Sequence, residues 1–67
     1  MGNSLRTCYV GLKGLDTAGR AKVEELVFRE STTPSYDRRN DEYRVITSLT
    51  LEEFRALPWP DGCTFRA

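Results

Sequence analysis

The segment Glu42–Phe54, EYRVITSLTLEEF, contains the two strongest structural signals in this chain of 67 residues. Its first half alternates with a period of two, which is typical of a β-strand with two different faces. One face carries Tyr43, Val45 and Thr47, and the other carries Arg44, Ile46 and Ser48. We therefore predict a strand over residues 42–49.

The second half of the segment marks the start of a helix. Thr50 and Glu53 have the spacing of a capping box, in which each side chain binds a free backbone N–H near the other residue. Leu49 and Phe54 fit the hydrophobic staple that often flanks such a box. Pro58 should end the helix, because proline lacks the N–H and disfavours helical geometry in the residue before it.

Toward the N-terminus, Ser4–Leu12 alternates in the same way as 42–49 and predicts another strand. Cys8, Val10 and Leu12 share one face of it, and Leu5, Thr7 and Tyr9 share the other. From Leu15 the spacing changes to that of a helix, which we expect to be capped by Asp16 or Thr17 and to end near Arg29. Its expected apolar stripe consists of Leu15, Ala18, Val23, Leu26 and Val27.

Two residues of this predicted helix stand out. Gly19 lies inside the apolar stripe, where it weakens the helix by about 1 kcal/mol relative to alanine, so we expect the helix to approach the sheet closely there. Phe28 projects away from the stripe. Either the helix has ended before it, or Phe28 is an exposed aromatic residue.

The remaining strands are weaker predictions. Ser31–Tyr36 contains Pro34 and suits a short edge strand, since proline cannot donate to a strand ladder. Residues 37–41 have the Asp and Asn that tight turns favour, which predicts a protruding hairpin with Tyr36 and Tyr43 near its neck. Cys63–Arg66 can form a last short strand. If 31–36 stays irregular, the sheet has three strands.

The element order is therefore strand, helix, weak strand, strand, helix, strand, without any linker that would divide residues 1–67 into two domains. We predict a single α+β domain, a small antiparallel sheet of three to four strands with two helices on one face, and we favour the ferredoxin-like βαββαβ order. In that order the first and last strands are neighbours and bring Cys8 and Cys63 into one region. We expect both cysteines to be small buried hydrophobic residues, and the alternative is a disulfide or a redox-sensitive pair.

The residue inventory argues against an enzyme and against a bound cofactor or metal. The chain contains no histidine, which is the usual acid–base group near neutral pH and the commonest metal ligand. Its adjacent glutamates, Glu24 with Glu25 and Glu52 with Glu53, point in divergent directions on their helices. No phosphate-binding glycine motif and no CxxC pair occurs.

Charge and hydropathy give a second set of expectations. Ten basic and ten acidic residues cancel and are mixed along the chain, so no long-range field attracts nucleic acid or anionic lipid. No apolar run reaches the roughly 20 residues needed to cross a bilayer. We expect a soluble, cytoplasmic protein that does not enter membranes.

The candidate contact site lies in Arg29–Tyr43, RESTTPSYDRRNDEY, a segment without Val, Leu, Ile, Met, Phe or Trp. Tyrosine and arginine are enriched at interface hot spots. The candidate partner-binding residues are Tyr36, Asp37, Arg38, Arg39, Asp41 and Tyr43. The alternative is a solvated loop whose charges only protect an edge strand. Trp59 is expected to close one end of the core, and is otherwise a second anchor for a partner.

These expectations favour a non-enzymatic protein-interaction module that binds a larger protein or complex. At this length, a small inhibitor or accessory factor of phage or mobile-element type is a suitable class. The alternative is a nucleic-acid-binding domain that stacks bases on Tyr9 and Tyr43 and meets phosphates with Arg38, Arg39 and Arg44. Against this, residues 42–47 lack the glycine and paired aromatics of an RNA-recognition strand.

Overall fold

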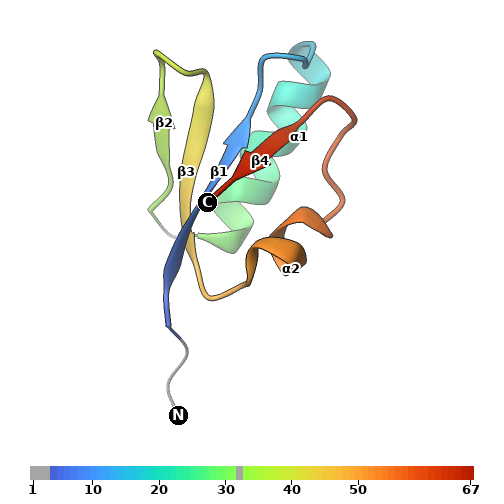
Figure 1. The fold of residues 1–67 in the computed structure, drawn as a ribbon. Coiled ribbons are helices and arrows are strands. Elements are labelled where there is room, and N and C mark those ends of the chain that lie inside the picture. Colours follow the sequence, from blue (N-terminus) through green and yellow to red (C-terminus); the bar gives the residue numbers. More distant parts are fainter. Residues whose placement is uncertain (1–3, 32) are drawn as a thin grey trace.

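The computed structural model describes residues 4–31 and 33–67 and has the predicted α+β class. Its four strands form one antiparallel sheet in the order β2-β3-β1-β4, so the first and last strands are neighbours, as expected (Figure 1). Two helices complete the fold. The elements, in chain order, are β1 (Arg6–Gly11), α1 (Thr17–Glu30), β2 (Ser35–Asp37), β3 (Glu42–Thr47), α2 (Leu51–Arg55) and β4 (Thr64–Arg66).

The centre of the sheet is the antiparallel pair of β1 and β3, which are matched over all six residues. Cys8 lies opposite Val45, and Val10 lies opposite Tyr43, so these four side chains share one face. Val10 also lies opposite Phe65 of β4. The predicted alternation of both long strands is confirmed, and it gathers their apolar side chains on one side of the sheet.

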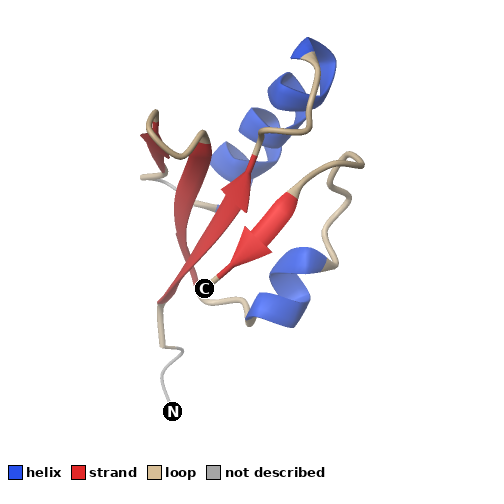
Figure 2. Cartoon of the chain, turned by 45° about the horizontal axis from the view of Figure 1, so that its top comes forward, coloured by secondary structure: helices blue, strands red, loops and turns tan. Residues whose placement is uncertain are grey.

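Both helices pack on that apolar face (Figure 2). Helix α1 contributes Val23 and Val27, and α2 contributes Phe54, each of them fully buried. Trp59 packs at the end of this core with its ring centroid 5.0 Å from that of Phe54, and its indole N–H donates to the Phe54 carbonyl oxygen at 2.6 Å. The expected role of Trp59 in closing the core is thus confirmed.

The ends of both helices follow the capping signals in the sequence. Asp16 caps α1 by accepting a hydrogen bond from the Gly19 N–H at 2.8 Å. Thr50 and Glu53 form the predicted capping box of α2, with hydrogen bonds of 3.1 and 2.9 Å. Helix α2 ends at Arg55, three residues before Pro58.

Two details of α1 differ from the prediction, and a third was left open by it. Ala18 is exposed, because the helix has only begun at Thr17 and its first turn lies beyond the core. A Cβ on Gly19 would meet Asp16 and Leu15 at 3.3 Å rather than the sheet, so the preceding loop and not the sheet restricts the space there. Phe28 is helical and 56% exposed, which decides between its two alternatives.

The predicted edge strand over 31–36 is shorter and shifted, since β2 covers only Ser35–Asp37. Residue 32 lies outside the described residues. The strand pairs with β3 along Glu42–Arg44. The sheet therefore has four strands, and the three-stranded alternative is wrong.

The two cysteines are free. Burial raises the pKa of both thiols, and Cys8 is only 1% exposed. Extending the register of β1 and β4 places Cys63 beside Leu12, four residues along the strand from Cys8. That offset corresponds to roughly 13 Å, beyond the approximately 7 Å over which a disulfide can form. The structure agrees with two separate residues, but only Cys8 is fully buried as expected, and Cys63 is partly buried.

Within the described part of the chain, neither helix is both long and apolar enough to cross a bilayer.

Two phenylalanines on helices give a test of the packing. Phe54→Ala should lower the free energy of unfolding by about 3–5 kcal/mol, because it empties a fully buried site. Phe28→Ala removes the same ring from an exposed position and should cost about 1 kcal/mol or less. Urea unfolding followed by circular dichroism measures both. If Phe54→Ala does not fold, Phe54→Leu should still lose more than Phe28→Ala, and equal losses would contradict the described core.

Candidate functional site

The predicted hairpin is present and consists of β2, the turn 38–41 and β3. Tyr36 and Tyr43 face each other across its two strands, with ring centroids 5.3 Å apart. The hairpin is not the protruding finger that was expected. The backbone oxygen of Asp41 accepts a hydrogen bond from the Leu12 N–H at 2.9 Å, and the Asp41 side chain is bound by α1.

Arg20 of α1 holds the base of the turn. Its two terminal nitrogens donate to the two carboxylate oxygens of Asp41 at 2.7 and 2.8 Å, in the bidentate geometry that makes such pairs strong. The Tyr36 hydroxyl donates to the same carboxylate at 2.6 Å. These bonds fix the left-handed backbone of Asp41, whose φ is 51°. We call Arg20, Asp41 and Tyr36 the hairpin clamp.

The hydrogen bonds of the clamp shift the pKa values of its three side chains. The hydrogen bonds from Arg20, followed by the one from Tyr36, lower the pKa of Asp41 from its ordinary 3.8 to about 2. The hydrogen bond to Asp41 raises the pKa of the Tyr36 hydroxyl, and the pKa of Arg20 is raised for the same reason. Asp41 is therefore a carboxylate, Arg20 a cation and Tyr36 a neutral donor near neutral pH.

The turn itself is shaped by Asp37. Its carboxylate accepts hydrogen bonds from the Arg39 N–H at 3.0 Å and from the Asn40 side-chain amide at 2.7 Å. The bond from the Asn40 side chain is the main cause of the lowered pKa of Asp37. Both acidic residues of the candidate site thus serve the shape of the hairpin, as aspartates often do in turns.

Arg38 and Arg39 remain at the tip of the turn. Both are exposed, and neither forms an ion pair within residues 4–31 and 33–67. The hairpin therefore presents two adjacent cations on a backbone that Asp37 and Asp41 hold in place.

The structure adds Phe28 to the site, although sequence analysis did not include it. The Phe28 ring stands edge-on to Tyr43, with centroids 6.4 Å apart, and Tyr43 in turn contacts Tyr36. Phe28 is 56% and Tyr36 44% exposed. We call Phe28, Tyr43 and Tyr36 the aromatic row. The projection of Phe28 away from the apolar stripe of the helix was the signal in the sequence, but the sequence could not show which strand the ring would contact.

Among residues 4–31 and 33–67, no helix covers the opposite face of the sheet (Figure 2), and the side chains on that face differ in kind. Tyr9 lies there opposite Arg44, whereas Tyr43 is on the helix side. The guanidinium of Arg66 covers the Tyr9 ring, with its carbon 3.9 Å from the ring centroid. The expectation that Tyr9 and Tyr43 form one stacking surface is therefore wrong, because neighbouring strands in this register place them on opposite faces.

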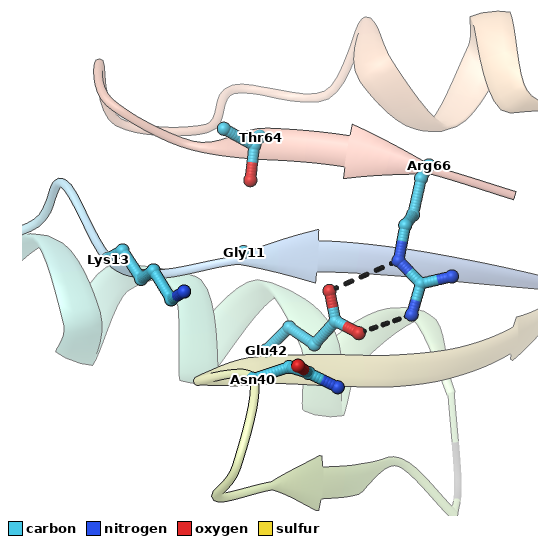
Figure 3. Close-up of a pocket in the computed structure, with 6 residues that line it drawn as sticks. All are labelled: Gly11, Lys13, Asn40, Glu42, Thr64 and Arg66. Carbon is cyan, nitrogen blue, oxygen red and sulfur yellow. Dashed lines mark hydrogen bonds and ion pairs between the residues drawn. The ribbon is translucent and has the colours of Figure 1, made fainter.

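A polar hollow of about 250 Å³ lies at one end of this open face (Figure 3). Its lining residues are Gly11, Lys13, Asn40, Glu42, Thr64 and Arg66. The side chain of Glu42, only 10% exposed, binds Arg66 at 2.5 Å across β1 and so fastens the edge strand β4 to β3. A Cβ on Gly11 would lie 2.2 Å from the Thr64 hydroxyl oxygen, so glycine makes room for that side chain. The ion pair of Glu42 with Arg66 is a structural bond between two of the residues that line this hollow.

No group of three or more His, Cys, Asp or Glu side chains that could hold a metal ion is found in the part of the chain that the structure describes.

Comparison with known proteins finds no family model, no curated protein and no solved structure that matches this chain. The ferredoxin-like arrangement stays a prediction, and function has to be argued from the site alone.

The clamp makes a prediction about pH. Because the pKa of Asp41 is about 2 in the folded chain and about 3.9 in an unfolded one, the clamp should stabilise the fold above about pH 4. That contribution should disappear as the pH falls toward 2. A carboxyl-carbon NMR titration measures the pKa directly, and Arg20→Gln should raise it toward 3.8. The matched control Arg39→Gln, which removes an exposed arginine, should leave the pKa of Asp41 below 3; a similar value in both variants would contradict the clamp.

Proposed function

We propose that this protein is a non-enzymatic interaction module that binds a larger protein through the aromatic row and the two arginines at the hairpin tip. The observation that carries this proposal is the row of three contacting rings from α1, β2 and β3, in which Phe28 and Tyr36 are exposed and Tyr43 is partly buried between them and the core. Aromatic residues supply large contact area at low cost in side-chain entropy and dominate interface hot spots. The two rings that are about half exposed, Phe28 and Tyr36, are not part of the described core.

The charges beside the row support the same proposal. The carboxylate of Asp41 binds Arg20, and the carboxylate of Asp37 accepts hydrogen bonds from the turn. Within the described residues, neither carboxylate forms an ion pair with the side chain of Arg38 or Arg39, so both arginines are available to a partner. Because the clamp and the turn hold this surface in one conformation, little ordering entropy is lost on binding. We infer that the contact surface of the partner is apolar at its centre and acidic where it meets the tip.

The proposal can be tested by comparing variants in the capture of a partner from native cell extract. Phe28→Ser should abolish or strongly reduce recovery of the partner, and Arg38→Ala with Arg39→Ala should weaken it. Ile46→Ser is the matched control for the phenylalanine, since Ile46 is exposed on the other face of the sheet. Arg55→Ala on α2 is the control for arginine. Circular dichroism should show that all variants are folded.

If wild type, Phe28→Ser and the double arginine variant recover a protein equally, that protein does not bind to this face. Equal loss from Phe28→Ser and Ile46→Ser would also contradict the proposal, because it would indicate a general effect of removing apolar surface.

The nucleic-acid alternative loses its geometric support with the separation of Tyr9 and Tyr43. We expect no measurable binding of a fluorescently labelled 20-nucleotide single-stranded RNA or DNA in a low-salt anisotropy titration. Affinity that appears at low salt and falls steeply as salt is added would indicate phosphate contacts and would favour the alternative. The Arg38→Ala, Arg39→Ala variant would then show whether the hairpin tip makes those contacts.

A further inference from the structure

A second hollow, of about 200 Å³, lies between α1 and the hairpin, within the face that we propose for partner binding. It is lined by Leu12, Arg20, Glu24, Tyr36 and Tyr43. Leu12 is only 2% exposed and the two tyrosine rings belong to the aromatic row. This volume is below the roughly 300–1,000 Å³ of small-molecule sites, so it suits one side chain of a partner rather than a free ligand.

Arg20 lines the hollow but is not available to bind an anion in it. Each of its terminal nitrogens donates to Asp41 and also reaches a second oxygen of the chain, at 3.4 Å. These second oxygens are the Leu12 carbonyl and the Tyr36 hydroxyl. The guanidinium is paired with the Asp41 carboxylate, so Arg20 closes one side of the hollow with its donors already occupied, although its charge still opposes that of Glu24 at Tyr43.

Glu24 supplies the charge that remains. It is exposed and forms neither an ion pair nor a side-chain hydrogen bond within residues 4–31 and 33–67. Its neighbour Glu25, in contrast, is paired with Lys22 at 3.9 Å and with Arg29 at 3.1 Å. Burial, followed by the charge of Glu24, raises the pKa of Tyr43, which agrees with a carboxylate close to that ring. The lining of the hollow therefore combines one uncompensated carboxylate with two aromatic rings.

We propose that this hollow binds a cationic side chain, lysine or arginine, of the partner protein, with the charge between Glu24 and the tyrosine rings. Aromatic rings attract cations placed over their faces, and the aliphatic stem of lysine or arginine can cover the apolar surface of the same rings. The same chain already uses this chemistry on the other side of the sheet, where Arg66 covers Tyr9. This inference rests on the proposed function and adds one cationic side chain that the partner would place in the hollow beside the aromatic row.

The test uses N-acetyl-lysine methylamide as the probe, in a titration of the isotope-labelled protein followed by amide NMR at constant ionic strength. We expect saturable shifts at Glu24, Tyr36 and Tyr43, and at least threefold weaker binding of the neutral analogue N-acetyl-norleucine methylamide. Glu24→Gln should weaken binding of the lysine probe about two- to fivefold, as expected for one exposed ion pair. Glu25→Gln, on the same helix, should leave it unchanged.

Equal binding of the two probes, or equal loss from Glu24→Gln and Glu25→Gln, would overturn the inference. Shifts of the same amides by acetate instead of the lysine probe would show an anion site and would also overturn it. These outcomes leave the proposed function standing if Phe28→Ser still loses the partner and Ile46→Ser does not. The reverse result is also possible. If the lysine probe binds but Phe28→Ser still recovers the partner, the hollow binds cationic side chains and the aromatic row is not the partner-binding surface.

Discussion

The register between β1 and β3 is the constraint on which the rest of the structure depends. Because side chains alternate along a strand, a shift of one residue would move every apolar side chain of one strand to the other face. The observed register sets Cys8 against Val45 and Val10 against Tyr43, and both helices pack on the resulting apolar face. It also places Tyr43 beside Phe28, and leaves Tyr9 on the open face under Arg66. The core and the candidate site thus have one cause.

The hairpin clamp holds the β2–β3 hairpin against α1. Tyr36 sits opposite Tyr43 because β2 pairs with β3, and Arg20 of α1 then binds both Tyr36 and Asp41. An edge strand of three residues is short and has only one neighbour, so a bond to the helix limits its freedom. The Asp41 carboxylate, the Arg20 guanidinium and the Tyr36 hydroxyl are bonded to one another within the chain. Beside them, Phe28 and Tyr36 of the aromatic row, Glu24 and the pair of arginines at the tip are exposed.

Several features could be predicted from the sequence because their causes are local. The capping box of Thr50 and Glu53 needs only three residues of separation, and the alternation of β1 and β3 is a property of each strand alone. The hairpin and its paired tyrosines also follow from neighbouring segments. Predictions that involved a second element were less reliable. Gly19 was expected to allow contact with the sheet but lies beside Leu15 and Asp16, and the hairpin expected to protrude is bound to α1.

The sequence by itself determined the α+β class, most residues of the core and the mixed-charge character of the hairpin, since periodicity, capping and turn chemistry act over a few residues. Only the tertiary structure decided that Phe28 joins Tyr43 and Tyr36, that Asp41 is bound by Arg20, and that Glu24 remains without a partner in the described chain. These facts depend on how α1 lies against the β2–β3 hairpin. No local pattern specifies that arrangement, because it results from packing two amphipathic elements so that their apolar faces are buried together.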